Sequence, residues 1–523
     1  MSWEGKIGVK AALVAVFIGG ICVGVGVYAL FSNKAQHVAL DSKATENATA
    51  STIEQLHAQE DKQDAQIIES SADSIIRNQT PIADFERKRY AKYVAMYAKP
   101  ISQWEQPHID EGVEWKEFAP LPEVAPSPKD NPITESKVRL GKRLFEEPKL
   151  SKSGQISCQS CHNAQLGFGD GLKVSIGHNR AQGRRNAPNI QMAGLFKELF
   201  WDGRADSLES QALFPIQDGV EMANTLENME MAIKNDESYY AAFIEAFGSD
   251  AQKAEWERAY PALFEREQDI NFSISFLEKR LKVPPEQKPE DNVIGLNANE
   301  RQQLREQVLA LFGTDSMQKP LSEKAARKQR ADTRAKAIQQ LSQAHKAQAR
   351  ELISIENITK AIASYERTLI PQDTRFNRFL KGEYEMLSPK EIYGMHIYRT
   401  KGRCMNCHFG DKLSDEKYHN LNIGLYGRLG QDLGRYEVSG KVEDIGAFRT
   451  PSLVNVRKSA PYGHNGIFPN FVGLMHLYDK ALPVPEFEGI KDDKNKPKID
   501  VLIKRLDLNT EELEALEAFM WAL

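Results

Sequence analysis

The sequence predicts a mainly α-helical protein, and two observations support this class. First, no segment of the 523 residues alternates apolar and polar side chains as a half-buried strand would, whereas helical patterns recur. Second, a C-x-x-C-H motif occurs twice, at residues 158–162 (CQSCH) and 404–408 (CMNCH). In this motif both thiols bond to a c-type haem and the His ligates its iron. We therefore expect two cytochrome c-type haem domains and two covalently bound haem c groups. The motifs supply Cys158, Cys161, Cys404 and Cys407 for the haem bonds, and His162 and His408 as proximal iron ligands.

The N-terminal residues predict a membrane anchor. Residues 11–31 contain no charged side chain and are long enough to cross about 30 Å of hydrocarbon as a helix. Lys6 and Lys10 precede this stretch, so we expect residues 1–10 in the cytoplasm and the rest of the chain outside the inner membrane. The expected location is the bacterial inner membrane, with a single pass and the body of the protein in the periplasm. A cleaved signal peptide is the alternative for the same segment.

Composition divides the rest of the chain into four segments. Residues 32–130 begin with a polar stretch and end in Pro-rich sequence, which predicts a periplasmic stalk or extension. Residues 131–248 and 353–523 are predicted to form the first and second haem domains. Residues 249–352 predict a charged helical insertion with a solvated surface; docking to an acidic redox partner or to lipid head groups is the alternative. The formal net charge of -5 excludes a general basic signature, so nucleic acid is not an expected partner.

Further short segments surround the two motifs. They are residues 131–134 (NPIT), 185–188 (RNAP), 200–204 (FWDGR), 448–453 (FRTPSL) and 460–466 (APYGHNG). Together they resemble the bacterial dihaem cytochrome c peroxidase family, over residues 131–247 and 353–523. The resemblance implies a peroxidase that reduces hydrogen peroxide to water with electrons from a small periplasmic c-type cytochrome or a quinol. It also implies that the first haem is peroxidatic and that the second transfers electrons.

For the first haem, the resemblance implies four functional residues. His178, the next histidine after the motif, corresponds to a releasable distal ligand that blocks peroxide until the second haem is reduced. Glu221, within the sequence GVEM, corresponds to the catalytic glutamate, because cleavage of an O–O bond needs a group that accepts a proton and returns it. Gln211 corresponds to a glutamine that orients peroxide, and Trp201 to a tryptophan between the haems.

The resemblance also implies a structural calcium ion between the two domains. Its ligands would be the side chain of Asn186 and the backbone carbonyls of Ser459 and Pro461. Because backbone ligands leave no trace in side-chain identity, this expectation depends on the resemblance alone.

The sixth iron ligand of the second haem departs from the family pattern. The family's peroxidases usually place a Met there, whereas alignment on Ala-Pro-Tyr brings Tyr478 to this position, with Met475 one helical turn earlier. A tyrosine at this position is similar to the MauG-type dihaem enzymes. Since a thioether raises the haem potential and a phenolate lowers it, the ligand affects which donor can reduce this haem. We favour Tyr478 and keep Met475 as the alternative.

The sequence leaves two alternatives to peroxide reduction open. The tyrosine at position 478 motivates a MauG-like dihaem oxidase that modifies a partner protein. A non-enzymatic dihaem electron-transfer module is the other alternative. The physiological donor and the oligomeric state, with a homodimer as one option, are also open.

Overall fold

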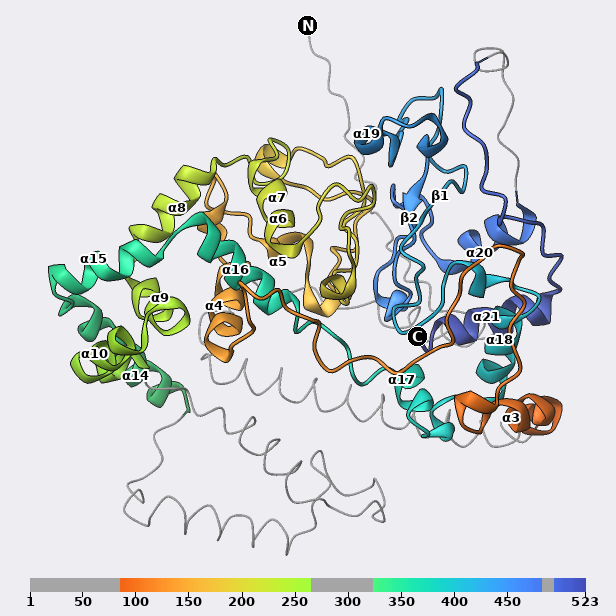
Figure 1. Ribbon diagram of the computed structural model, residues 1–523, viewed down its shortest axis with the longest axis horizontal. Coiled ribbons are helices and arrows are strands. Elements are labelled where there is room, and N and C mark those ends of the chain that lie inside the picture. Colours follow the sequence, from red (N-terminus) through yellow and green to blue (C-terminus); the bar gives the residue numbers. More distant parts are fainter. Residues whose placement is uncertain (1–84, 265–322, 482–492) are drawn as a thin grey trace, which may run out of the picture. The chain divides into compact units, whose positions relative to one another are not determined.

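Helices dominate the part of the chain that the structure, a computed structural model, describes: residues 85–264, 323–481 and 493–523 (Figure 1). The one sheet among these residues has two strands, with β1 (Tyr418–His419) antiparallel to β2 (Phe448–Arg449). The predicted mainly α-helical class is therefore confirmed. Within the same described ranges, no helix has both the length and the apolar character that a membrane crossing requires. The predicted cytoplasmic segment and anchor, residues 1–31, lie outside the described residues.

The first haem domain is built on two crossing helices, α4 (Glu135–Phe145) and α16 (Ile355–Glu366), which lie side by side in Figure 1. The side chain of Thr134 accepts a hydrogen bond from the first turn of α4 and so fixes where this helix begins. At the crossing, a Cβ on Gly141 would lie 1.8 Å from the carbonyl oxygen of Ala361. The helices can therefore approach this closely only because residue 141 is glycine. The core of the domain includes Leu140, Leu144, Phe145, Tyr240, Phe243, Ile358 and Ile362.

The second haem domain is built on a crossing of α18 (Pro389–Arg399) with α21 (Thr510–Met520). The side chain of Ser388 caps α18. A Cβ on Gly394 would lie 1.8 Å from the carbonyl oxygen of Ala515, so this crossing also requires a glycine. The core of this domain includes Phe376, Phe379, Tyr398, Leu516 and Phe519.

The two haem domains thus repeat one arrangement that the sequence analysis did not identify. In each, the helix that precedes the C-x-x-C-H motif crosses a later helix at a glycine. The shared contact is between a glycine and a backbone carbonyl group, so it leaves no side-chain pattern that a comparison of the two halves could detect. By this repeat, α16 takes the position in the first domain that α21 takes in the second.

Three segments pack differently from their expected assignment. Residues 85–125 fall within the predicted extension, yet Tyr97 of α3 (Ala91–Tyr97), Trp104 and Phe118 are buried in the core of the second haem domain. Helix α16 falls within the predicted second domain but belongs to the core of the first. In the predicted insertion, Trp256 is buried in that same first core. Burial of aromatic side chains explains why these segments pack against the haem domains.

The remaining helices complete the two domains. In the first domain and the described part of the predicted insertion they are α5 (Cys158–Cys161), α6 (Leu208–Gln211), α7 (Leu213–Gln217), α8 (Leu226–Lys234), α9 (Tyr240–Phe247), α10 (Asp250–Ala259), α11 (Pro261–Phe264), α14 (Glu323–Gln339) and α15 (Gln343–Leu352). In the second domain they are α17 (Arg375–Leu380), α19 (Tyr436–Ser439) and α20 (Phe471–Lys480).

A buried ion pair joins the two haem domains. Arg185 of the first domain donates from Nε and Nη2 to the two carboxylate oxygens of Asp432 in the second, at 2.7 Å each. Arg185 also pairs with Asp202 of its own domain. Only 11% of the Arg185 side chain is exposed, so this double pair is shielded from solvent.

Candidate active site

Both C-x-x-C-H motifs fold as a single helical turn. The backbone N–H of His162 donates to the carbonyl of Cys158 at 2.9 Å, and that of His408 donates to Cys404 at 2.8 Å. A turn of this kind places both thiols and the following imidazole on one side of the backbone. All four motif cysteines are free, so their thiols are available for covalent attachment.

The two proximal histidines are oriented for iron binding. Nδ1 of His162 lies 3.0 Å from the carbonyl oxygen of Phe168, and Nδ1 of His408 lies 2.9 Å from that of Leu413. A carbonyl accepts hydrogen bonds only, so each ring carries its proton on Nδ1 and directs an unprotonated Nε2 away from the backbone. Burial lowers the pKa of both imidazoles and keeps them neutral, as iron ligation requires. These residues fit a c-type haem at each motif.

One cavity of about 280 Å³ is lined by both His162 and His408. Its walls come from both haem domains and include Gln211 of α6 and Trp201. The predicted residues Gln211 and Trp201 are therefore brought to the same space as the two proximal histidines. Neither His178 nor Glu221 is among the residues that line this cavity.

His178 and Glu221 are instead brought together by their backbones. The N–H of His178 donates to the carbonyl oxygen of Glu221 at 2.7 Å. A Cβ on Gly177 would lie 2.1 Å from the carbonyl oxygen of Val220, so the two loops are in close contact. The Nδ1 atom of His178 is buried without a hydrogen bond to any described residue.

Glu221 lies within electrostatic reach of the first haem-attachment motif. Burial raises the pKa of the Glu221 carboxyl, and the nearby charge of Asp218 raises it further. Glu221 in turn contributes to the raised pKa of the Cys161 thiol, whose main cause is burial. The carboxyl is thus close to this motif and poorly solvated, which favours proton exchange at a higher pH than for an exposed glutamate.

Trp201 is fixed at the junction of the two domains. Its indole Nε1 donates to the carbonyl oxygen of Asn186 at 2.9 Å, and its own carbonyl accepts from the N–H of Arg449, in β2, at 2.8 Å. Gly203 adopts a left-handed conformation with φ +70°, and a Cβ there would collide with the Tyr418 hydroxyl. These contacts hold the indole between elements of both domains.

The three residues expected to bind calcium line the same cavity. Asn186, Ser459 and Pro461 all line the cavity between the domains. The amide NH₂ of Asn186 donates to Leu172, while its Oδ1 and the carbonyl oxygens of Ser459 and Pro461 accept no hydrogen bond from a described residue. Three oxygens without donors are the hard ligands that Ca²⁺ prefers, so this set fits a calcium ion.

At the second motif, α20 presents both candidate sixth ligands. Tyr478 and Met475 line the same cavity as His408. Burial raises the pKa of the Tyr478 hydroxyl, and Cys407 and Cys404 contribute to the shift, so its ring lies near the attachment thiols. The hydroxyl of Tyr478 makes no hydrogen bond within the described part of the chain. The geometry thus brings both residues to the site and leaves the choice between them open.

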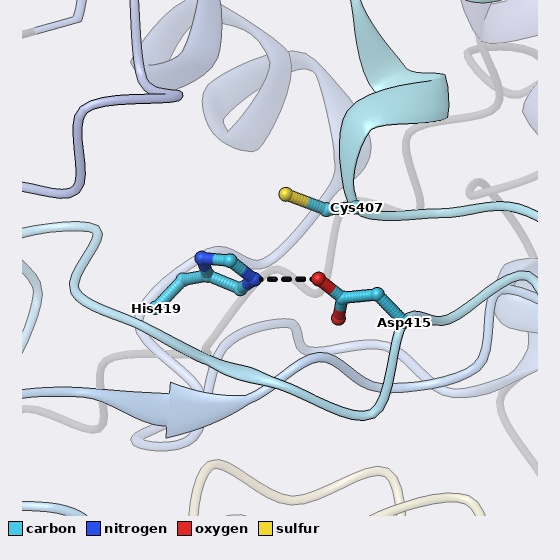
Figure 2. A group of neighbouring side chains, drawn as sticks. All are labelled: Cys407, Asp415 and His419. Carbon is cyan, nitrogen blue, oxygen red and sulfur yellow. Dashed lines mark hydrogen bonds and ion pairs between the residues drawn. The ribbon is translucent and has the colours of Figure 1, made fainter. Parts of the chain in front are cut away.

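Sequence reasoning missed a charged cluster beside the second motif, formed by Asp415, His419 and Asp500. His419 Nε2 lies 2.8 Å from Asp415, as Figure 2 shows, and Nδ1 lies 2.7 Å from Asp500. Cys407 Sγ is within 4.8 Å of the Asp415 and His419 ligand atoms. This is not a metal site, because both ring nitrogens of His419 are engaged and Cys407 is an attachment thiol. No motif surrounds His419, so no pattern in the chain marks this residue.

Glu366 was also missed, although its sequence position carries a signal. It follows Ile358 and Ile362 at four-residue steps along α16, so it lies on the apolar face of that helix. Its side chain lines the cavity with His162 and Gln211. A carboxyl on a helix stripe that is otherwise apolar is the pattern that would have identified it.

The fold and the site define a class: a dihaem c-type protein with two haem pockets on one cavity. The family model for di-haem cytochrome c peroxidase matches residues 135–282 and 291–385. The matched residues are thus assigned to the di-haem cytochrome c peroxidase family.

Named relatives agree with this assignment. The chain is 26% identical over 435 residues to the cytochrome-c peroxidase IdrP1 of Pseudomonas sp. (strain SCT), covering 78% of this chain and 85% of the relative. It is 24% identical over 401 residues to the methylamine utilization protein MauG of Methylorubrum extorquens, covering 76% and 81%. The cytochrome c551 peroxidase of Nitrosomonas europaea is 26% identical over 328 residues, covering 62% and 68%.

Proposed function

We propose that this protein reduces hydrogen peroxide to water, with electrons entering at the second haem motif and peroxide reacting at the first. The observation that carries this proposal is the single cavity lined by both proximal histidines, Gln211 and Trp201. Bound haem supplies the iron that takes up electrons and binds peroxide. The side chains of the protein orient the peroxide and carry protons to its oxygens.

Glu221 is the proposed proton carrier. Two protons must reach the oxygens of peroxide, and a poorly solvated carboxyl, whose pKa burial raises, can accept a proton and return it. Gln211 lines the cavity on the same domain and orients peroxide through its amide. Trp201, fixed between the domains, provides the aromatic group through which electrons cross.

His178 is the proposed gate. Its imidazole is held on the loop that contacts the backbone of Glu221, so release of this loop would also free the carboxyl to move. The gate and the proton carrier therefore act as one unit. The loop of His178 would open only in the half-reduced protein, and the turnover measurements below test this.

The test is steady-state turnover with a reduced small c-type cytochrome or a quinol, measured on oxidised and half-reduced protein. We expect turnover only after half-reduction in the wild type, and in both states in His178→Gly. A protein inert in both states would refute peroxide reduction. A His178→Gly variant that still needs prereduction would refute the gate alone.

Glu221→Gln should lower kcat by about 10²–10⁴-fold, because the amide cannot carry a proton. Haem content and absorption spectra should remain those of the wild type. The matched control is Glu227→Gln, which changes an exposed acid of α8 and should retain full turnover. Equal losses in both variants would contradict the role of Glu221.

Further parts of the proposal concern calcium, location and donor. A Ca²⁺ ion at Asn186, Ser459 and Pro461 would brace the two domains; chelation should slow electron transfer between the haems, and Ca²⁺ but not Mg²⁺ should restore it.

An anchor at residues 11–31 would hold the body on the periplasmic face of the inner membrane. The electron donor would be a small c-type cytochrome or a quinol. We also propose that the protein forms a homodimer, and sedimentation would measure its oligomeric state.

The second candidate function is MauG-like oxidation of a partner protein, favoured by the position of Tyr478 in the cavity. Near-infrared absorption and paramagnetic resonance of Tyr478→Phe and Met475→Leu identify the sixth ligand. We expect the spectrum to change in Tyr478→Phe. An unchanged spectrum in both variants would exclude both residues.

A further inference from the structure

Glu366 is an acidic residue at the first haem pocket that the proposed peroxide chemistry does not use. It is the last residue of α16, the helix that closes this domain. Its side chain lines the cavity with His162 and Gln211, and only 6% of the residue is exposed. Its Oε2 atom is buried and has no hydrogen-bond partner among the described residues. An ionised carboxylate in this position would lack both water and a donor, which is costly.

The neighbouring guanidinium of Arg367 does not balance a negative charge on Glu366. Arg367 follows Glu366 directly, but its guanidinium makes a bidentate pair with Glu209 of α6, through Nη1 and Nη2 at 2.8 Å each. Asn131 also donates to Glu209 at 2.7 Å. The charges that face Glu366 are therefore an arginine and a glutamate already paired with each other.

The protonation state of Glu366 follows from these surroundings. Burial raises the pKa of its carboxyl to about 8, Arg367 lowers it and Glu209 raises it. Near pH 8 the carboxyl of Glu366 is therefore partly ionised and can still take up a proton. The same group contributes to the raised pKa of the Cys158 thiol, so it lies within electrostatic reach of the first attachment motif.

We propose that Glu366 couples electron arrival at the first haem to the uptake of one proton. One electron from the donor reduces the haem iron, and one proton from solvent binds the Glu366 carboxylate; no bond to peroxide is formed or broken. The added electron makes the poorly solvated pocket more negative, and protonation of a carboxylate in that pocket offsets this charge. The proposal rests on the proposed function only in that the first motif carries haem.

The sign of the coupling is fixed by this electrostatics. Reduction favours the protonated carboxyl, so the pKa of Glu366 is higher in the reduced protein than in the oxidised one. The potential of the first haem should therefore fall as the pH rises between these two pKa values. If one proton is taken up with each electron, the potential of the first haem falls by about 59 mV for each tenfold decrease in proton concentration.

The test is a spectroelectrochemical titration of the first haem at several pH values, without peroxide. The parent is the haem-loaded His178→Gly/Glu221→Gln protein, so that neither the proposed gate nor the other poorly solvated carboxyl near this motif contributes to the measured potential. We expect its potential to fall with rising pH around pH 8 and to be independent of pH there in the parent carrying Glu366→Gln. An equal pH dependence in both proteins, or none in the parent, would overturn the proposal.

If the Glu366→Gln protein does not take up haem, two further measurements test the proposal without it. Glu366→Asp retains an acid, so its potential should remain pH-dependent with a displaced window; loss of the dependence would count against the proposal. Infrared difference spectra of the Glu221→Gln protein on reduction at about pH 8 should show the carbonyl stretch of a protonated carboxyl, shifted in D₂O. Absence of this band would overturn the proposal. None of these measurements requires turnover, so an inert protein that shows the coupling would refute the proposed function and retain this inference.

Discussion

At the scale of single residues, His419 shows how a histidine in a haem domain can have a purely electrostatic role. It lies between Asp415 and Asp500, and their hydrogen bonds outweigh the effect of burial and raise the pKa of His419 far above its usual range. The pKa values of both carboxyls are lowered in the folded protein. The imidazole is therefore a buried cation balanced by two anions.

This arrangement predicts the effect of His419→Leu on stability and its dependence on pH. Removal of the cation leaves buried carboxylates uncompensated, which should lower the free energy of unfolding by about 3–5 kcal/mol. Because the folded pKa of His419 is raised, its stabilising contribution is complete below about pH 6.5 and decreases by about 1.4 kcal/mol per pH unit above it. The deficit of the variant should thus shrink from pH 6 to pH 9.

Urea denaturation of both haem-loaded proteins at these two pH values measures the deficit. His476→Gln, at an exposed position of α20, is the control and should change stability by less than about 0.5 kcal/mol. A deficit that stays constant or grows with pH would contradict a cationic His419.

At the scale of elements, the two helix crossings depend on their glycines. Gly141→Ala and Gly394→Ala each introduce a Cβ within 1.8 Å of a carbonyl oxygen. Such overpacking should lower the free energy of unfolding by about 1–3 kcal/mol. Gly473→Ala is the matched control, because this helical glycine of α20 has its nearest neighbour at 3.5 Å, and alanine should be neutral or stabilise by up to about 1 kcal/mol.

Thermal denaturation of the three variants tests this contrast. Gly141→Ala should also reduce haem retention at the first motif, and Gly394→Ala at the second, since each crossing closes its own pocket. Equal behaviour of all three glycines would show that helix propensity, and not close approach, determines these positions.

The elements also show what sequence can and cannot predict. The two motifs could be identified because haem attachment requires particular residue types at a fixed spacing, whereas Gln211 and Trp201 were expected only from the family resemblance. The role of α16 could not, because the crossing at Ala361 is a backbone contact between segments far apart in the chain. Glu221 was identified by its sequence neighbours, but its position outside the cavity lining depends on how two loops pack.

At the scale of the whole molecule, two adjacent arginines allow the coupling between haem domains to be tested. Both arginines pair across the domain junction: Arg185, 11% exposed, with Asp432, and Arg184, 64% exposed, mainly with Glu437. Arg185→Gln should cost about 3–5 kcal/mol in unfolding free energy, because it leaves buried carboxylates behind. Arg184→Gln should cost at most about 1 kcal/mol.

The second readout for this pair is the rate of electron transfer from the second haem to the first after rapid reduction. It should fall in Arg185→Gln, because the junction also fixes Trp201, and should be unchanged in Arg184→Gln. If both variants transfer electrons at the wild-type rate, the ion pair stabilises the fold without affecting the path between the haems.

The position of α16 in the chain has a consequence for biosynthesis. During translation the first C-x-x-C-H motif emerges long before residues 355–366, so the pocket around Cys158 is still incomplete when its thiols first become available. An open pocket suits covalent attachment, since thiols that burial makes poorly reactive in the finished fold are accessible in the nascent chain. Helix α16 arrives later, packs into the core beside Cys158 and brings Glu366 to the cavity. The order in which the ribosome supplies the two crossing helices is thus also the order in which cofactor loading and closure can occur.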